Sequence, residues 1–166
     1  MADRIILLGR AGVGKTTLAK RLADVTGGVV ICLDAIWQPS WTAADVPAFR
    51  EAVASLHADE SWISDGNFAD ATFDLRLPRA TLILWLDAPR LLCSWRAIVR
   101  VLKQGEPHKA RDLYKVFRFI WRFDSVNRPR IEAAIQRFGP RIPVRKLYGG
   151  KQLSRFLVEM GCRSTD

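Results

Sequence analysis

Residues 9–16 read Gly-Arg-Ala-Gly-Val-Gly-Lys-Thr and fit the pattern G-x-x-x-x-G-K-[ST] directly after the apolar run 5–8. Glycines let a tight loop turn its backbone N–H groups onto phosphate oxygens, because no Cβ blocks the approach. Lys15 adds a mobile positive charge for the β and γ phosphates, and Thr16 offers a hydroxyl to Mg²⁺. The spacing therefore predicts a loop that binds ATP with Mg²⁺, in preference to a chance glycine-rich turn. The residues expected to contact the nucleotide are Gly9, Arg10, Ala11, Gly12, Val13, Gly14, Lys15, Thr16 and Thr17.

A second candidate for the metal side of this site is Asp65, which follows the short apolar run 62–64 and precedes Gly66-Asn67. Ligands of open α/β sheets bind at the carboxyl ends of the strands, where this carboxylate would lie. We expect Asp65 to hold a water of the Mg²⁺ shell, while Gly66 allows a close approach to the phosphate loop. The alternative is an ordinary turn, since turns favour the Asp-Gly dipeptide.

Two further aspartates follow apolar runs, Asp34 in ICLD and Asp87 in LILWLD. Asp34 opens a segment rich in aromatic residues that includes Trp37 and Trp41. This composition favours a pocket for a phosphate acceptor, in which Asp34 accepts a hydrogen bond from the acceptor hydroxyl or deprotonates it. Core packing of the two tryptophans is the alternative. Asp87 precedes Ala88-Pro89, and we expect it to cap the next helix.

Lysine and arginine concentrate in residues 90–146, which hold 15 of them against four acidic residues, in a chain whose net charge is +9. Arg96, Arg100 and Lys103 recur at i, i+4 and i+7 and so form one stripe along a helix. A second stripe comprises Arg111, Lys115, Arg118 and Arg122. Arginine forks stabilise the charge that surrounds a transferring phosphoryl group, which favours a catalytic role for Arg96 and Arg100. Solvated helix faces, or contact with a polynucleotide backbone, are the alternatives.

The elements that must position these residues follow from the hydrophobic pattern. Apolar runs that end in polar residues predict five short strands, at 4–8, 29–33, 62–64, 81–86 and 143–147. Helical spacing predicts helices over 15–26, from Thr42 to about His57, from Pro89 past Leu102, over 109–123, over 129–138 and over 151–160. Strands that alternate with helices predict a parallel sheet covered on both faces.

The length of 166 residues predicts one domain with a full hydrophobic core. No apolar run approaches the roughly 20 residues of a membrane-spanning helix, so we expect no membrane partner. Because the first predicted strand begins at residue 4, we expect no signal peptide. The cysteines Cys32, Cys93 and Cys162 are widely spaced and suggest neither a disulfide framework nor a zinc site, which favours a cytoplasmic location. His57 and His108 have polar neighbours in sequence and are expected at the surface.

Five segments together give the chain a family resemblance: GRAGVGKTTLA, LDAIW followed by Trp41, WISDGNF, LDAPRLLCSWR and WRFDSVNRPRI. In order and spacing they resemble the small P-loop kinases of the adenylate kinase-like superfamily, most closely the FlaR-related DNA topology modulation proteins. The resemblance covers nearly the whole chain. It implies a metal-side role for Asp65-Gly66, a mobile lid that opens with Arg96 and Arg100, and an acceptor-binding region that begins at Asp34. The chain departs from the kinase pattern after Asp-Gly, where Asn67-Phe68-Ala69 replaces Phe-Pro-Arg.

We therefore expect a three-layer α/β fold of the P-loop NTPase type, with a five-stranded parallel sheet in the order 2-3-1-4-5. An acceptor-binding insert at about 34–60 and a helical lid at about 101–124 complete the expected domain. The expected activity is Mg²⁺-dependent transfer of the γ-phosphate of ATP to a small acceptor such as a nucleoside monophosphate. Catalysis is assigned to Lys15, Arg96, Arg100 and Asp65, and the metal to Thr16 and Asp65. The residues expected on the acceptor side are Asp34, Trp37, Arg50, Asn67, Arg76 and Arg128.

Two other functions stay open at this point. The basic helices favour nucleotide-dependent binding of DNA as an alternative, with nucleic acid as a secondary partner. The phosphate loop alone would also suit an ATPase that has no small acceptor. No guanine-reading Asn/Thr-Lys-x-Asp motif occurs in the sequence, which favours ATP over GTP.

Overall fold

The computed structural model describes residues 3–38, 40–104 and 107–161, apart from the side chains of residues 103–112. Within these ranges five parallel strands form one sheet in the order β2-β3-β1-β4-β5. The strands are β1 (Arg4–Leu8), β2 (Val29–Cys32), β3 (Trp62–Asp65), β4 (Leu82–Asp87) and β5 (Val144–Tyr148). The fold class and the strand order predicted from the sequence are confirmed.

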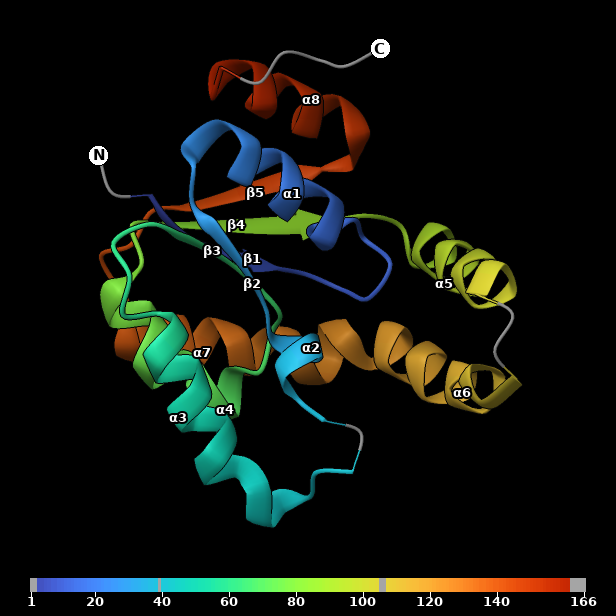
Figure 1. Cartoon of the computed structure of the whole chain (residues 1–166). Helices are drawn as coiled ribbons and strands as arrows, with labels where there is room; N and C mark the ends of the chain where they lie inside the picture. The colour runs from blue at the N-terminus through green and yellow to red at the C-terminus, as the bar shows by residue number, and fades with distance from the viewer. Residues whose placement is uncertain (1–2, 39, 105–106, 162–166) are drawn as a thin grey trace.

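Helices cover both faces of the sheet (Figure 1). On one face lie α1 (Lys15–Thr26) and α8 (Gly149–Glu159), and on the other lie α3 (Val46–Leu56), α4 (Ala69–Arg76) and α7 (Arg128–Phe138). Beyond the carboxyl end of β4, α5 (Arg90–Gln104) and α6 (Pro107–Arg122) pack against each other as a hairpin. The short elements are α2 (Leu33–Ile36), η1 (Ala43–Asp45), η2 (Leu77–Arg79) and the π-helical segment η3 (Phe123–Asn127).

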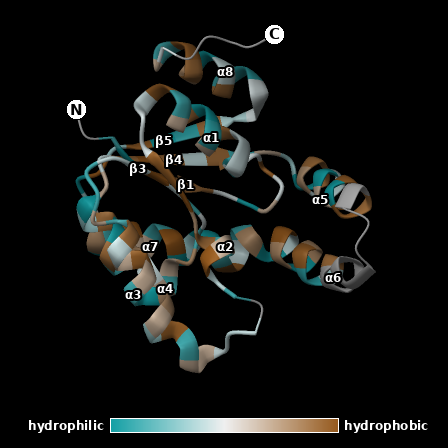
Figure 2. Cartoon of the chain, viewed as in Figure 1, coloured by the Kyte–Doolittle hydropathy of each residue, from teal (hydrophilic) through white to brown (hydrophobic). Residues whose placement is uncertain are grey.

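The central strands are apolar on both faces because both faces are covered by helices. Along β1 the side chains alternate between two cores: Ile5 and Leu7 pack towards α1 and α8, whereas Ile6 and Leu8 pack towards α3 and α7. Figure 2 shows β1 in the brown of hydrophobic residues at the centre of the sheet, between helices that carry both hydrophobic and hydrophilic residues. This arrangement brings the carboxyl ends of β1, β2, β3 and β4 to one edge of the sheet.

The predicted helices are found, with small shifts in their ends. The N-terminal signal at Thr42 is a capping box: its hydroxyl accepts from the N–H of Ala44, and Asp45 accepts from the N–H of Thr42. That signal begins η1, which leads directly into α3. The short helices α2 and α4 were not predicted. Within the described ranges, no helix is both long enough and apolar enough to cross a membrane.

The surface position expected for His57 is wrong, because only 1% of the residue is exposed. Its Nδ1 lies 2.7 Å from the carbonyl of Val53 and its Nε2 lies 2.9 Å from Ser64 Oγ. The ring packs edge-on against Trp62 at 4.6 Å between centroids. Both ring nitrogens are satisfied inside the protein, so the imidazole can be buried without loss of hydrogen bonds. The side chain of His108 lies outside the described residues.

Candidate functional site

The phosphate loop joins the end of β1 to the start of α1, and three of its glycines have positive φ. Gly9, Gly12 and Gly14 have φ of 143°, 76° and 109°. A Cβ on Gly9 would lie 2.4 Å from the carbonyl oxygen of Leu86, and one on Gly12 would lie 2.5 Å from that of Cys93. The loop is therefore pressed against the end of β4 and the first turn of α5, which only glycine permits.

Lys15 lies over this loop. Its Nζ donates to the carbonyl oxygens of Gly9 at 3.1 Å and Arg10 at 3.0 Å. Burial lowers the pKa of the Lys15 ammonium, while the carboxylates of Asp65 and Asp34 oppose that shift. The two acids thus favour the charged form of Lys15 at the place where the sequence puts the phosphates.

Thr16 and Asp65 meet as the sequence predicts. The hydroxyl of Thr16 donates to Asp65 Oδ2 at 2.6 Å. The other oxygen of the same carboxylate, Oδ1, is buried and has no hydrogen-bond partner among the described residues. A hydroxyl beside an unpaired carboxylate oxygen fits the hard oxygen ligands that Mg²⁺ prefers. In the described part of the chain, no group of three or more His, Cys, Asp or Glu side chains is placed to hold a metal ion.

Asn67 fixes the loop after β3 to the phosphate loop. Its Oδ1 accepts from the N–H of Gly9 at 3.2 Å, and its Nδ2 donates to the carbonyl of Gly9 at 3.0 Å. Asn67 lines the cavity described below, but its amide is engaged with Gly9. Its role is thus to hold Asp65 in register with the glycine loop.

Arg76 binds residues 64–67, at the end of β3 and in the loop after it, and does not line the cavity described below. It is fully buried, and its Nη1 donates to Ser64 Oγ at 3.0 Å and to the carbonyl of Gly66 at 3.1 Å. Its Nη2 donates to the carbonyl of Asn67 at 2.5 Å. Burial lowers the pKa of Arg76 to about 9, so the guanidinium remains a cation at neutral pH. Arg76 positions residues 64–67 and, against expectation, makes no part of an acceptor pocket.

A cavity of about 890 Å³ opens above these groups. It is lined by the phosphate loop from Ala11 to Thr17 and by Asp34 and Asp65. Arg96 and Arg100 enter it from α5, and Arg96 Nη1 contacts the carbonyl of Val13 at 3.4 Å. The structure therefore brings together Lys15, Thr16, Asp65, Asp34, Arg96 and Arg100, which the sequence placed in one site.

Three arginines expected at the site have their side chains committed elsewhere. Arg50 binds Asp74 through both Nη atoms, at 2.9 and 2.6 Å. Arg128 donates to Asp87 at 2.6 Å and to Asp124 at 3.1 Å. The guanidinium of Arg10 binds the same two aspartates, and only the backbone of Arg10 belongs to the phosphate loop. None of the three lines the cavity formed by the described residues.

Two other expectations are corrected by the same contacts. Asp87 accepts from Arg10, from Arg128 and from the N–H of Ala88, so its carboxylate serves an ion-pair cluster instead of capping α5. Trp37 packs at 5.7 Å from Trp41 and 5.2 Å from Phe49. The structure therefore shows Trp37 and Trp41 packed against other aromatic side chains, which was the alternative to a role in the acceptor pocket.

The far end of the cavity contains residues that the sequence did not single out for the acceptor. From α4 and the turn before it come Phe68, Ala69, Asp70 and Ala71, and from α6, η3 and α7 come Phe119, Asn127, Arg130 and Ile131. Arg130 follows Arg128 and Pro129 in the sequence, and that pair of arginines is the only local pattern among these residues. The others are ordinary residues whose place depends on how α4, α6 and α7 pack.

No family model matches the sequence, and no curated protein is recognisably similar to it. The fold, however, resembles that of solved kinases. A shikimate kinase from Acinetobacter baumannii in complex with shikimate aligns at a TM-score of 0.60 and 14% identity, covering 99% of this chain and 97% of that one. A shikimate kinase from Bacteroides thetaiotaomicron aligns at a TM-score of 0.56 and 18% identity, and the alignment covers 95% of each chain.

A gluconokinase from Sinorhizobium meliloti 1021 aligns at a TM-score of 0.53 and 15% identity over 99% of this chain and 98% of that one. Identities this low establish a shared fold. The chain therefore shares the fold of these structures over nearly its whole length.

Proposed function

We propose that the protein is a Mg²⁺-dependent kinase that transfers the γ-phosphate of ATP to a hydroxyl of a small acceptor. One observation carries the proposal: a single cavity holds Lys15, the Thr16–Asp65 pair, Asp34 and two arginines of α5. Charge of both signs around an open space suits phosphoryl transfer, in which positioning and electrostatic stabilisation provide most of the catalysis. The fold neighbours named as shikimate kinase and gluconokinase support the same class of reaction.

In this proposal the backbone N–H groups of the phosphate loop and Lys15 hold the β and γ phosphates. Thr16 and Asp65 would hold Mg²⁺, which supplies neutralisation of phosphate charge when bound. Arg96 and Arg100 stabilise the charge that develops on the transferring group as the hairpin of α5 and α6 closes over it. Arg96 already touches the loop carbonyl of Val13, so the distance to be closed is small.

Asp34 is the proposed general base. Burial raises the pKa of its carboxyl and Lys15 opposes the shift, while the nearby Asp65 raises the pKa further. A base whose pKa is raised towards neutrality accepts a proton more readily. The acceptor hydroxyl gives its proton to Asp34, its oxygen bonds to the γ-phosphorus, and the bond from that phosphorus to the bridging oxygen breaks to release ADP.

The test compares Lys15→Met with Lys20→Met, a change of an exposed lysine on α1. Release of ADP is followed with Mg-ATP and a panel of sugars, hydroxy acids, nucleosides and nucleoside monophosphates. We expect Lys15→Met to lose turnover with an unchanged circular dichroism spectrum, and Lys20→Met to retain it. ADP release that is equal in the two variants would refute the proposal. Release that no acceptor stimulates would favour the ATPase without an acceptor.

DNA binding, which the FlaR-like resemblance suggests, is the second candidate. It has one structural observation in its favour, since Arg118 and Arg122 of α6 are exposed. Binding of this kind falls steeply between about 50 and 200 mM salt as counterions are released. Fluorescence anisotropy with duplex DNA should then show a lower affinity for the double variant Arg118→Gln/Arg122→Gln than for the unaltered protein. Absence of binding by the unaltered protein at 50 mM salt would remove this candidate.

A further inference from the structure

Ser64 is a polar residue at a position of the sheet where its neighbours are apolar. The residues beside it on the adjacent strands are Ile6 of β1 and Ile31 of β2. Both isoleucines belong to the core between the sheet and the helices α3, α4 and α7. Ser64 lies between them on β3 and is fully buried. A buried hydroxyl costs free energy unless it is hydrogen-bonded, so the role of Ser64 depends on its partners.

The Ser64 hydroxyl links two buried side chains, His57 and Arg76. Its Oγ lies 2.9 Å from His57 Nε2 and 3.0 Å from Arg76 Nη1. Burial lowers the pKa of His57 to about 4, so the ring is neutral at pH 7 and carries one N–H. That N–H is on Nδ1, because Nδ1 faces the carbonyl of Val53 at 2.7 Å and a carbonyl can only accept. Ser64 therefore donates its proton to His57, and its oxygen accepts from Arg76.

Arg76 continues this connection into the loop after β3. Its Nη1 also donates to the carbonyl of Gly66 at 3.1 Å, and its Nη2 donates to that of Asn67 at 2.5 Å. Its Nε donates to Thr72 Oγ1 at 2.9 Å, and that hydroxyl donates to the carbonyl of Phe68 at 3.0 Å. Because the guanidinium is planar, acceptors on all three of its nitrogens fix its orientation. The loop is thereby fixed relative to β3 and α4.

The segment that Arg76 binds carries two links to the phosphate loop. Asp65 accepts from the hydroxyl of Thr16 at 2.6 Å. Asn67 exchanges two hydrogen bonds with the backbone of Gly9, at 3.2 and 3.0 Å. A shift of this segment would therefore move the metal-side carboxylate and release the backbone of Gly9 at the same time.

We infer that Ser64 is a positioning residue of the proposed kinase site. By orienting Arg76, its hydroxyl keeps Asp65 beside Thr16 and keeps Asn67 against the phosphate loop. Ser64 itself does not line the cavity formed by the described residues. The inference rests on the proposed function, because Asp65 is the metal-side carboxylate of that proposal. A side chain that acts through the ligand-binding residues in this way changes metal affinity or activity by about 10- to 100-fold when it is replaced.

The first measurement is amide hydrogen exchange, followed by NMR in the protein without nucleotide. The Gly9 N–H, which donates to Asn67 Oδ1, reports on the phosphate loop. The N–H of Leu84, in the buried middle of β4, reports on opening of the whole sheet. In Ser64→Ala we expect exchange at Gly9, relative to exchange at Leu84, to become at least about tenfold faster than in the unaltered protein.

Two further variants separate the hydrogen-bond network from a general loss of packing. Thr72→Val removes another acceptor of Arg76 and keeps the shape of the side chain, so the same acceleration at Gly9 is expected. Ser94→Ala is the control, because the Ser94 hydroxyl is buried but has no hydrogen-bond partner among the described residues. Its relative exchange at Gly9 should stay within about twofold of the unaltered protein.

Two outcomes of the exchange measurement would overturn the inference. One is an unchanged relative exchange at Gly9 in either Ser64→Ala or Thr72→Val. The other is a Gly9 amide that exchanges without protection in the unaltered protein, since the loop would then not be held.

The second measurement is kinetic and uses whichever acceptor stimulates ADP release. We expect Ser64→Ala to lower kcat, and to raise the Mg²⁺ concentration for half-maximal activity, by at least about tenfold. The KM for the acceptor should stay within about threefold, because a positioning effect on the metal side leaves acceptor binding intact. Ser94→Ala should match the unaltered protein. Unchanged kcat and Mg²⁺ dependence in Ser64→Ala would overturn the inference. If no acceptor stimulates ADP release, the kinase proposal fails, and exchange at Gly9 still decides whether Ser64 positions the loop.

Discussion

At the scale of single residues, the two carboxylate oxygens of Asp65 have different surroundings. One oxygen of its carboxylate accepts from Thr16 and the other is buried without a partner among the described residues. We expect Asp65→Asn to lower kcat by about 10- to 100-fold and to raise the Mg²⁺ concentration needed for half-maximal activity, because the amide is a weaker ligand. Asp24→Asn, on the exposed side of α1, is the control. The same Mg²⁺ dependence in both variants would contradict the assignment.

The burial of His57 predicts how the free energy of unfolding depends on pH. Burial lowers its pKa to about 4, against 6.5 for an exposed imidazole. Between these values the unfolded chain binds a proton that the native protein does not, so the free energy of unfolding falls as the pH drops from 6.5 to 4, by about 3 kcal/mol in all. We expect urea unfolding of His57→Gln at pH 7 and pH 4.5 to show a smaller difference than the unaltered protein shows. Equal differences would rule out a neutral, buried His57.

At the scale of elements, the contact between the phosphate loop and α5 depends on Gly12. Alanine there would have an unfavourable φ of 76° and its Cβ would lie 2.5 Å from the carbonyl of Cys93. Gly27, with φ of 69° and no atom within 4 Å of its would-be Cβ, isolates the conformational cost of about 1–2 kcal/mol. We expect Gly27→Ala to keep its affinity for an ATP analogue and Gly12→Ala to lose at least about tenfold, measured by calorimetry. Similar affinities would mean that the loop does not need this close approach.

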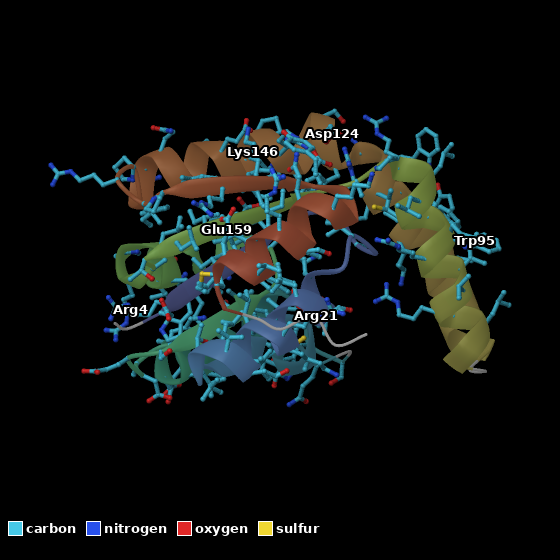
Figure 3. All side chains as sticks on the ribbon, turned by 90° about the horizontal axis from the view of Figure 1, so that it is seen from above. Arg4, Arg21, Trp95, Asp124, Lys146 and Glu159 are labelled. Atoms are coloured by element: carbon cyan, nitrogen blue, oxygen red, sulfur yellow. The ribbon has the colours of Figure 1, made fainter. Side chains whose placement is uncertain are left out.

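The orientation of α5 shows where sequence reasoning reaches its limit. Its apolar stripe includes Trp95 and Leu102, yet these side chains are 63% and 73% exposed, and Figure 3 shows Trp95 on the outer side of the helix. Arg96 and Arg100 face the cavity instead. Both stripes have helical spacing, so periodicity predicts the helix but not which stripe turns inward. Only the packing of α5 against α6 and the phosphate loop decides that.

The same limit separates the two halves of the site. The phosphate loop and Asp65 follow from short local patterns whose chemistry fixes their geometry, whereas the strand order was expected together with the fold that the family resemblance implies. The acceptor side depends on long-range pairing. The sequence shows Arg50, Arg76 and Arg128, but it does not show that these side chains bind Asp74, Ser64 and Asp124 within the protein. The helix α4 was missed for a related reason, since it is short and is preceded by Phe68 in a left-handed conformation.

At the scale of the whole molecule, a cluster of five charged residues joins parts of the site that are distant in sequence. It consists of Arg10 in the phosphate loop, Asp87 at the end of β4, Arg90 at the start of α5, Asp124 in η3 and Arg128 at the start of α7. Asp124 contacts all three arginines. The cluster therefore connects the phosphate loop to the base of the α5 and α6 hairpin, and the π-helical η3 gives Asp124 its place in it.

Removal of the Asp124 charge should destabilise the protein as a whole. The side chain of Arg10 is only 7% exposed, so Asp124→Asn leaves a buried cation with one carboxylate where it had two. We expect a loss of about 3 kcal/mol in the free energy of unfolding by urea at pH 7. Glu159→Gln, which breaks an ion pair with Arg145 whose side chains are 56% and 51% exposed, should cost less than about 1 kcal/mol.

The pH dependence of the same variant gives an independent check. Burial alone would raise the pKa of Asp124, but hydrogen bonds from Arg90, Arg10 and Arg128 outweigh burial and lower it to about 2, from an ordinary value of 3.8. A depressed carboxyl pKa stabilises the native state above pH 3.8, and the contribution is lost as the pH falls from 3.8 towards 2. Between pH 5 and pH 2.5 the unaltered protein should therefore lose more stability than Asp124→Asn, because the amide has no proton to gain. Parallel losses in the two proteins, together with a cost at pH 7 no larger than that of Glu159→Gln, would show that the cluster does not hold the phosphate loop to the hairpin.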